Sequence, residues 1–147
     1  MLTIQPQRVH FDLIQTSQHG ILEIDGPSLE EIVPLGFKFT HSFTEANACL
    51  QLCKELPLDK GLLLRNQPQE SYKFHVEAPN YDIDILGIDE NGRIRQIEKC
   101  HSNSNSEFQF HDCAYLLVLK SGVSKILGIS PDGSTTVQIL FYQEKLN

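Results

Sequence analysis

The chain lacks long hydrophobic runs and a recognisable export signal, and both absences limit where the protein can act. Its longest uninterrupted apolar run, Ala114 to Leu119, is far too short to cross a bilayer. The N-terminal stretch MLTIQPQRVHFDLIQ has neither a basic region nor an apolar core, so we predict no signal peptide. We therefore expect a cytoplasmic protein.

Positive charge is also scarce, with 12 Lys and Arg against 19 Asp and Glu and a net charge of −7. Such a chain, without any basic cluster, repels phosphate backbones and anionic lipid surfaces. We therefore expect no nucleic acid and no membrane among its partners. In the reducing cytosol its four cysteines are expected to stay free thiols.

The familiar catalytic motifs are missing too. No Ser or Cys stands in a motif such as Gly-x-Ser-x-Gly, and GISPDGS lacks the Lys and the spacing of a phosphate-binding loop. No cofactor is expected.

What is present indicates one domain, residues 1–147, of α+β class and mainly β. Ser42 and Glu45 form a capping box, and an apolar stripe follows at helical spacing, so the main helix is expected over about 43–56. PSLEEIVP predicts a shorter helix, and RVHFDLI predicts a strand. Further strands are expected at 62–65, 72–77, 82–88, 93–99, 107–110, 114–119 and 135–142.

The segment YDIDILGIDENGR predicts a β-hairpin. A three-residue loop ending in a left-handed Gly92 sets Ile88 opposite Ile94 and Ile85 opposite Ile97, and we prefer it to a two-residue loop because apolar side chains then meet. Asp84 shares a face with Leu86 and Ile88. We therefore expect Asp84 to be at least partly covered and held by Arg65 or by a backbone donor, and Asp82 to be exposed.

Three segments resemble domain-of-unknown-function family 192 over about residues 37–140. KGLLLR (60–65) is similar to the family's Gly-Leu-Met-Phe-Arg signature. FHVEAPNYDIDILGIDENGRI (74–94) is similar, without a gap, to the segment that leads to Pro-Leu-Asp-Ile and an Asp-x-x-Gly turn. AYLLVLKSGVSKILGISPDG (114–133) is similar to the family's closing segment. On this match residues 1–36 form an N-terminal extension packed on the core.

The chain departs from the family pattern at several polar positions. His75, Val76, Glu77 and Ala78 stand where members often have Trp, Met, Lys and Asn, and Asp82 replaces a Pro. Arg65 and Asp84 keep the family's charge. The resemblance implies a compact β-barrel or sandwich with little helix, and it implies no activity.

Four residues are candidates for ligand binding. Arg65 can pair bidentately with Asp84, as a ligand clamp or as a structural ion pair. His75 and Glu77 are same-face neighbours on a predicted strand, where a His–carboxylate pair can act as a general base. We therefore assign no catalytic residue from these pairs.

Ligand-type side chains also gather around the loop HSNSNSE: Cys100, His101, His111, Asp112 and Cys113. Zinc requires four such groups in tetrahedral reach, and this spacing matches no established zinc motif. We therefore expect no bound metal, with Cys100, His101, His111 and Cys113 as the fallback ligands. Cys49 and Cys53, at i and i+4 of the helix, are expected to pack in the core.

The sequence favours a non-catalytic module that binds a small ligand or a protein partner. One alternative is a hydrolase-like enzyme that uses Asp84, His75 and Glu77. The other is a structural or interaction domain that presents a sheet edge.

Overall fold

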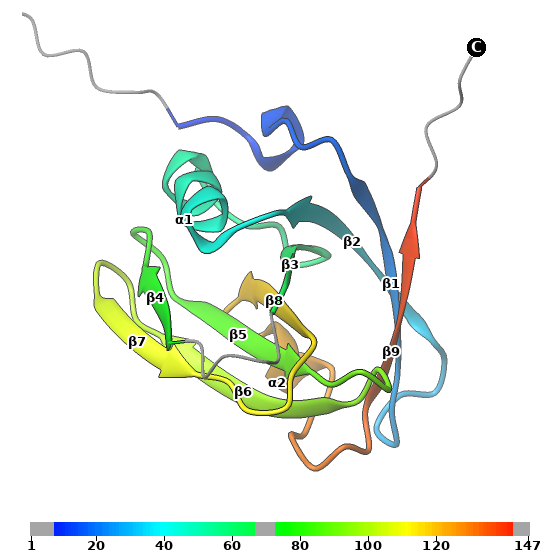
Figure 1. The fold of residues 1–147 in the computed structure, drawn as a ribbon. Helices are drawn as coiled ribbons and strands as arrows, with labels where there is room; N and C mark the ends of the chain where they lie inside the picture. Colours follow the sequence, from blue (N-terminus) through cyan, green and yellow to red (C-terminus); the bar gives the residue numbers. More distant parts are fainter. Residues whose placement is uncertain (1–7, 67–72, 143–147) are drawn as a thin grey trace, which may run out of the picture.

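Strands dominate the computed structural model, which describes residues 8–66 and 73–142 (Figure 1). In chain order the elements are η1 (Phe11–Leu13), β1 (His19–Asp25), β2 (Val33–Thr40), α1 (Phe43–Leu52), β3 (Lys60–Arg65), β4 (Lys73–Glu77), β5 (Ile83–Ile88), β6 (Ile94–Cys100), β7 (Asn105–Gln109), β8 (Tyr115–Lys120), α2 (Val123–Ile126) and β9 (Thr136–Phe141). Among the described residues no helix is long and apolar enough to cross a bilayer.

Seven strands form one curled sheet in the order β6-β5-β8-β3-β2-β1-β9, and β4 pairs with β7 in a smaller sheet. Neighbours are antiparallel except β2 and β3, which are parallel and connected through α1. Within residues 8–66 and 73–142, the two edge strands meet at one end, through an Arg93–Thr136 bridge and a bond from Val137 N–H to the Gly92 carbonyl. The large sheet is therefore a half-barrel, and the expected mainly β, α+β fold is confirmed.

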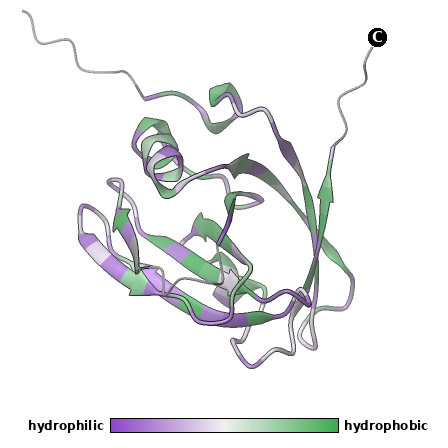
Figure 2. Cartoon of the chain, in the orientation of Figure 1, coloured by the Kyte–Doolittle hydropathy of each residue, from purple (hydrophilic) through white to green (hydrophobic). Residues whose placement is uncertain are grey.

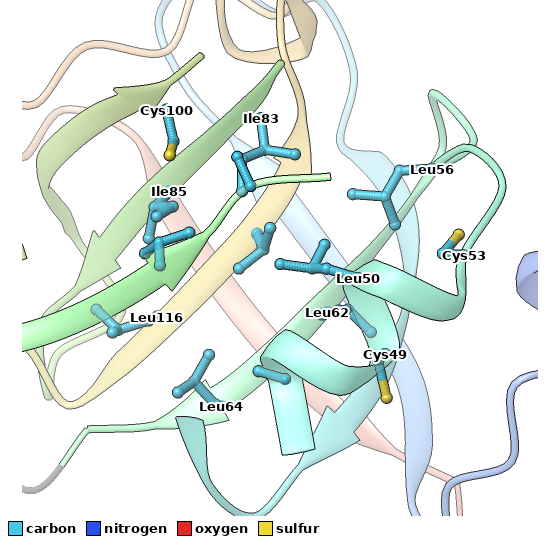
Figure 3. Packing of buried hydrophobic residues seen from close by; sticks show 14 of the residues in the cluster. Cys49, Leu50, Cys53, Leu56, Leu62, Leu64, Ile83, Ile85, Cys100 and Leu116 are labelled. Carbon is cyan, nitrogen blue, oxygen red and sulfur yellow. The ribbon is translucent and has the colours of Figure 1, made fainter. Parts of the chain in front are cut away.

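Buried side chains cover the inner face of the large sheet and, at β3, β5 and β8, the other face as well. The helix-side core lies under α1 and the small sheet, and in Figure 3 Leu50 points from α1 toward the strands. The inner core fills the hollow of the curled sheet. Members of the helix-side core include Leu50, Leu62, Leu64, Val76, Ile83, Ile85 and Leu116, and members of the inner core include Leu22, Phe37, Leu63, Leu86, Ile88, Leu117 and Val123. Successive residues alternate between the two cores because strand side chains have a period of two.

The main helix begins as expected and ends early. The Ser42 hydroxyl accepts a hydrogen bond from the Glu45 N–H at 3.1 Å, so the predicted N-cap is confirmed. The helix stops at Leu52 rather than near 56, because Cys53 is already extended and bridges to Val9. The two bridged residues are 44 positions apart in the sequence, so local helix propensity cannot predict this end of the helix.

The hairpin has the predicted loop and a register shift beyond it. Gly92 is left-handed, with φ +79°, and Ile88 lies opposite Ile94 as expected. A β-bulge then makes Ile97 the partner of Leu86, so the predicted pairing with Ile85 is wrong. A bulge adds one residue to one strand and thereby shifts every later pair.

The N-terminal forty residues were the least predictable. RVHFDLI forms an isolated bridge and the η1 turn instead of a strand, and PSLEEIVP contains turns and the start of β2 instead of a helix. Neither β2 as a whole nor α2 was predicted. The later strands are confirmed to within two residues of their predicted ends, apart from Tyr72, which lies outside the described residues.

Candidate functional site

Asp84 is a buried anchor of the fold. Its side chain lies on the inner-core face of β5 and the residue is 6% exposed. The carboxylate accepts a hydrogen bond from the Ser124 hydroxyl at 2.9 Å and another from the Gly122 N–H at 3.2 Å. The expected burial of Asp84 and its bond to a backbone donor are confirmed. In the described contacts, the partners of its carboxylate are Ser124 and Gly122 and not Arg65. Asp84 thus fastens the start of α2 to the sheet.

Asp82 is partly exposed and binds the loop between β6 and β7. Its side chain is 39% exposed and accepts the Ser102 N–H at 2.7 Å, with His101 Nδ1 4.0 Å away. The expectation of a plainly exposed residue is therefore corrected: Asp82 holds the turn between β6 and β7. A strand start leaves its carboxylate free to accept from the next loop, as Asp side chains commonly do.

His75 and Glu77 lie on the exposed side of β4, beside α1. Their main-chain groups are bound by α1 side chains: Asn47 bridges the His75 carbonyl and the Glu77 N–H, and Gln51 donates to the Glu77 carbonyl. The two side chains border a shallow groove of about 460 Å³ that Phe43 also lines. The amides of α1 therefore satisfy the strand edge of β4, as a neighbouring strand would.

The four predicted ligand-binding residues are not gathered in one place. Asp84 points into the inner core, whereas β4, which carries His75 and Glu77, covers the helix-side core on the opposite face of the sheet. Arg65 is exposed at the end of β3. A shared site of Asp84, His75 and Glu77 has no support in this arrangement.

The possible metal ligands are also apart. Among the described residues no group of three or more His, Cys, Asp or Glu could hold a metal ion. Cys100 and Cys113 are buried free thiols, and His101, His111 and Asp112 are exposed. Burial raises the pKa of the Cys113 thiol to about 11, so it is a poor source of thiolate.

Cys49 and Cys53 are buried in the helix-side core, as predicted, and burial raises the pKa of both thiols. Cys53 Sγ donates to the Glu55 carbonyl at 3.1 Å. Both behave as small apolar side chains.

A cleft that sequence reasoning missed lies where η1 crosses the start of β1, β2 and β3. We name it the Lys38 cleft. It encloses about 420 Å³ and its lining includes Phe11, Gly20, Gly36, Lys38, Lys60 and Tyr142. This volume is within the range of small-molecule sites, and apolar walls with a few convergent polar groups are their usual composition.

Two ammonium groups converge on one aromatic ring in this cleft. Lys38 Nζ lies 4.7 Å and Lys60 Nζ 5.9 Å from the centre of the Phe11 ring. Lys38 donates to the carbonyl of Phe11 and, at 2.5 Å, to that of Ile14, while Lys60 pairs with Asp12 at 2.6 Å. An ammonium has three N–H groups, so Lys38 keeps one and Lys60 keeps two beyond these bonds.

The register of the parallel pair places the two lysines on one face. Gly36 lies opposite Lys60 and Lys38 opposite Leu62, so both ammonium stems rise from the same side of the sheet. Gly36 has no side chain, which leaves the floor of the cleft open between them. η1 then contributes Phe11 as the facing wall.

Burial gives Lys38 its particular electrostatics. Partial desolvation lowers the pKa of Lys38 below its ordinary 10.5, and the negative charge of Asp12 opposes this shift. The hydrogen bond and charge of Lys60 lower the pKa of Asp12. Lys38 contacts neutral carbonyls rather than a carboxylate, so its charge is compensated only at a distance. Asp12 and Asp59 also line the cleft, so its formal charge is balanced, and the N–H groups that Lys38 and Lys60 keep are its donors for an additional anion.

Sequence reasoning could not assemble this cleft, because its parts come from five separated segments and match no motif. The one available signal was the alternation in GFKF, which sets Lys38 on the face opposite Phe37 and Phe39. The strand predicted for residues 8–14 also concealed the turn that presents Phe11.

Comparison with known proteins shows that this fold occurs in other solved structures. Two solved structures are similar to this chain. One, a Sinorhizobium meliloti 1021 protein described as a "putative transcription regulator", has a TM-score of 0.69 and 22% identity over 85% of this chain and 97% of its own. The other, a protein of unknown function from Novosphingobium aromaticivorans DSM 12444, has a TM-score of 0.68 and 17% identity over 80% of this chain and 83% of its own. At such identities the likeness shows the fold alone.

The search of curated proteins found no match. The family model of DUF192, described as an uncharacterized ACR, matches residues 31–137, which include all of β2 to β8 and the first residues of β9. The resemblance seen in the sequence is confirmed. Since the match spans well over half of its length, the chain belongs to the DUF192 family.

Proposed function

We propose that this protein is a non-catalytic module that binds a small organic carboxylate in the Lys38 cleft. The observation that carries the proposal is the pair of ammonium groups over the Phe11 ring, with N–H donors to spare. A carboxylate would accept from both lysines, and an apolar body would lie against Tyr142, which is 52% exposed, since the Phe11 ring is almost fully buried.

Binding without catalysis is favoured by the chemistry of the cleft. Among the described residues that line the cleft, none is a Ser or Cys that could attack a bound ligand, and the imidazole is that of His19. The hydrolase alternative would need Asp84 and His75 together, and these side chains lie on opposite faces of the sheet. A cytoplasmic setting remains part of the proposal, supported by four free, buried thiols.

The Sinorhizobium meliloti neighbour is described as a "putative transcription regulator". At 22% identity that likeness carries no activity to this chain. A net charge of −7 also disfavours direct contact with nucleic acid. This surface fits the sensing of a small metabolite better than the reading of DNA.

Titration of the labelled protein with benzoate and phenylacetate, followed by amide NMR shifts, tests the proposal. We expect the amides of Gly20, Gly36 and Lys38 to shift with each acid, and benzamide and phenylacetamide to bind at least about tenfold more weakly. Binding should weaken between neutral pH and about pH 10, as Lys38 loses its proton at a pKa below 10.5.

Lys60→Gln removes the charge and leaves a polar side chain that is one atom shorter, so the affinity for benzoate should fall about tenfold. Lys125→Gln, at an exposed position of α2 outside the cleft, is the matched control and should bind normally. Equal binding of acid and amide, or shifts confined to other parts of the chain, would contradict the proposal.

A further inference from the structure

The free edge of β9 differs from the other edge of the sheet. From Thr136 to Tyr142 the strand TVQILFY contains no charged residue and no Pro. The opposite edge, β6, carries Arg95, Glu98 and Lys99 and is bulged. Charges and bulges are the usual protection of an edge against pairing with another strand. Figure 2 shows the C-terminal end of β9 coloured as hydrophobic.

Backbone groups of β9 point alternately toward β1 and away from it. Tyr142 N–H donates to His19 on β1, whereas Val137 N–H points the other way, to Gly92. Because antiparallel strands alternate residue by residue, the N–H and C=O groups of Ile139 and Phe141 face the free edge. In the part of the chain that the structure describes, no bond from another segment reaches these four groups.

We propose that two copies of this chain pair through β9, antiparallel, about a twofold axis at Leu140. This axis sets Ile139 of one copy opposite Phe141 of the other, twice. The two pairs form four N–H···O=C bonds, which use the four free groups of each copy. A contact of this kind is isologous and closes after two copies.

The side chains are complementary to themselves in this register. On the outer face, Leu140 meets its own copy and Ile21 on β1 extends the row on each side. The next row sets Gln138 beside Tyr142 of the other copy. Glu23, the β1 partner of Gln138, then lies in the row that ends at His19 of the other copy, so like charges do not meet.

The inner face also accepts the pairing. Phe141 is 42% exposed although its ring makes edge contacts with Phe37 and Phe39, so its remaining surface is free to be covered. Leu140 and Tyr142 are 39% and 52% exposed in the same short stretch. Burial of this surface adds an apolar gain to the four backbone bonds. The contact is short, so we expect a weak dimer.

The dimer contact shares His19, Ile21 and Tyr142 with the lining of the Lys38 cleft, whereas Leu140 does not line it. Substitution of Leu140 therefore tests the pairing without changing the cleft. Sedimentation of the wild-type chain from about 5 to about 200 μM should show a concentration-dependent dimer. Leu140→Lys places two like charges at the axis and should weaken dimerisation at least about tenfold. Ile126→Lys, on the 75% exposed apolar residue of α2, is the control and should dimerise as the wild type does.

A thiol at the axis tests the register itself. Directly opposed residues of a non-hydrogen-bonded pair have Cα atoms about 4.5 Å apart, so Leu140→Cys should give a covalent dimer with oxidised glutathione. Gln138→Cys, exposed on the same face of β9, should not, because it faces Tyr142. A wild-type chain that stays monomeric throughout the range would leave this edge to a strand of another protein and overturn the pairing of two copies. Equal cross-linking of both variants, or a dimer that persists in Leu140→Lys, would also overturn it.

Discussion

At the scale of single residues, buried polar groups in this protein hold the fold together. Asp84 is the clearest case, since its two acceptor bonds join β5 to the segment that begins α2. The sequence alone predicted its burial correctly, because Leu86 and Ile88 share its face. It could not identify the donors, since Gly122 and Ser124 lie 38 and 40 residues away.

Replacement of Asp84 by Ala should destabilise the protein by about 3 kcal/mol at neutral pH, because two hydrogen bonds to a charged acceptor are lost in a buried place. Ser124→Ala removes one donor only and should cost about 1 kcal/mol. The double variant should be less destabilised than the sum, since the two residues share one bond.

Chemical denaturation of the three Asp84 and Ser124 variants measures these differences. Asp84→Ala within about 0.5 kcal/mol of the wild type would contradict the structural role. If that stable variant also lost benzoate binding, Asp84 would return as a functional residue.

At the scale of elements, prediction succeeded where a local signal coincided with the tertiary environment. Strands β3, β5 and β8 have compact apolar runs between turn residues, and both of their faces are buried. β2 has a Pro and a Gly within VPLGFKFT, which weaken the strand signal, yet its neighbours β1 and β3 hold it in the sheet. In PSLEEIVP the capping pattern indicated a helix, but the segment forms turns and the start of β2, which pairs with β1.

The sequence signal was sufficient to predict where α1 starts. Ser42 caps the Glu45 N–H, and the Glu45 carboxylate accepts the His41 N–H at 3.0 Å. Ser42→Ala should therefore cost about 1 kcal/mol in the free energy of unfolding, through a lost cap. Thr44→Ala, at an exposed position in the same first turn, is the control and should leave stability nearly unchanged. If the denaturation midpoint and slope of Ser42→Ala equal those of the wild type, the cap contributes nothing.

At the scale of the whole molecule, the half-barrel closes through one turn. The β5–β6 turn contacts the loop before β9, and Arg95, the extra residue of the bulge, reaches Asp89 at 3.1 Å. Gly133 has φ +85°, which favours glycine in the loop before β9, and a Cβ there would also displace the flexible Arg95 guanidinium 2.5 Å away. The family resemblance could predict the turn glycines, but not that two distant turns lie against each other.

Asp89 is the centre of this closure. Its carboxylate accepts the N–H groups of Asn91 and Arg93, both at 2.9 Å, and its side chain is 12% exposed. Burial alone would raise the pKa of Asp89, but the bonds from Arg93, Arg95 and Asn91 outweigh it and lower the pKa below 3.8. The folded state therefore holds the charged form more strongly than the unfolded state does.

The stabilisation by Asp89 should accordingly be complete above the unfolded-state pKa of about 3.9 and disappear as the pH falls through the lower folded-state value. Asp89→Ala should cost about 2 kcal/mol at neutral pH and less in acid, as measured by denaturant melts at both pH values. Hydrogen exchange gives the local result: the Val137 amide, which donates to Gly92 in the same turn, should lose protection. Glu90→Ala, exposed in the same turn, should change neither quantity. A Val137 amide as protected in Asp89→Ala as in the wild type would mean that β9 is held by its pairing with β1 alone, because the closing turn would then have no influence on the edge strand.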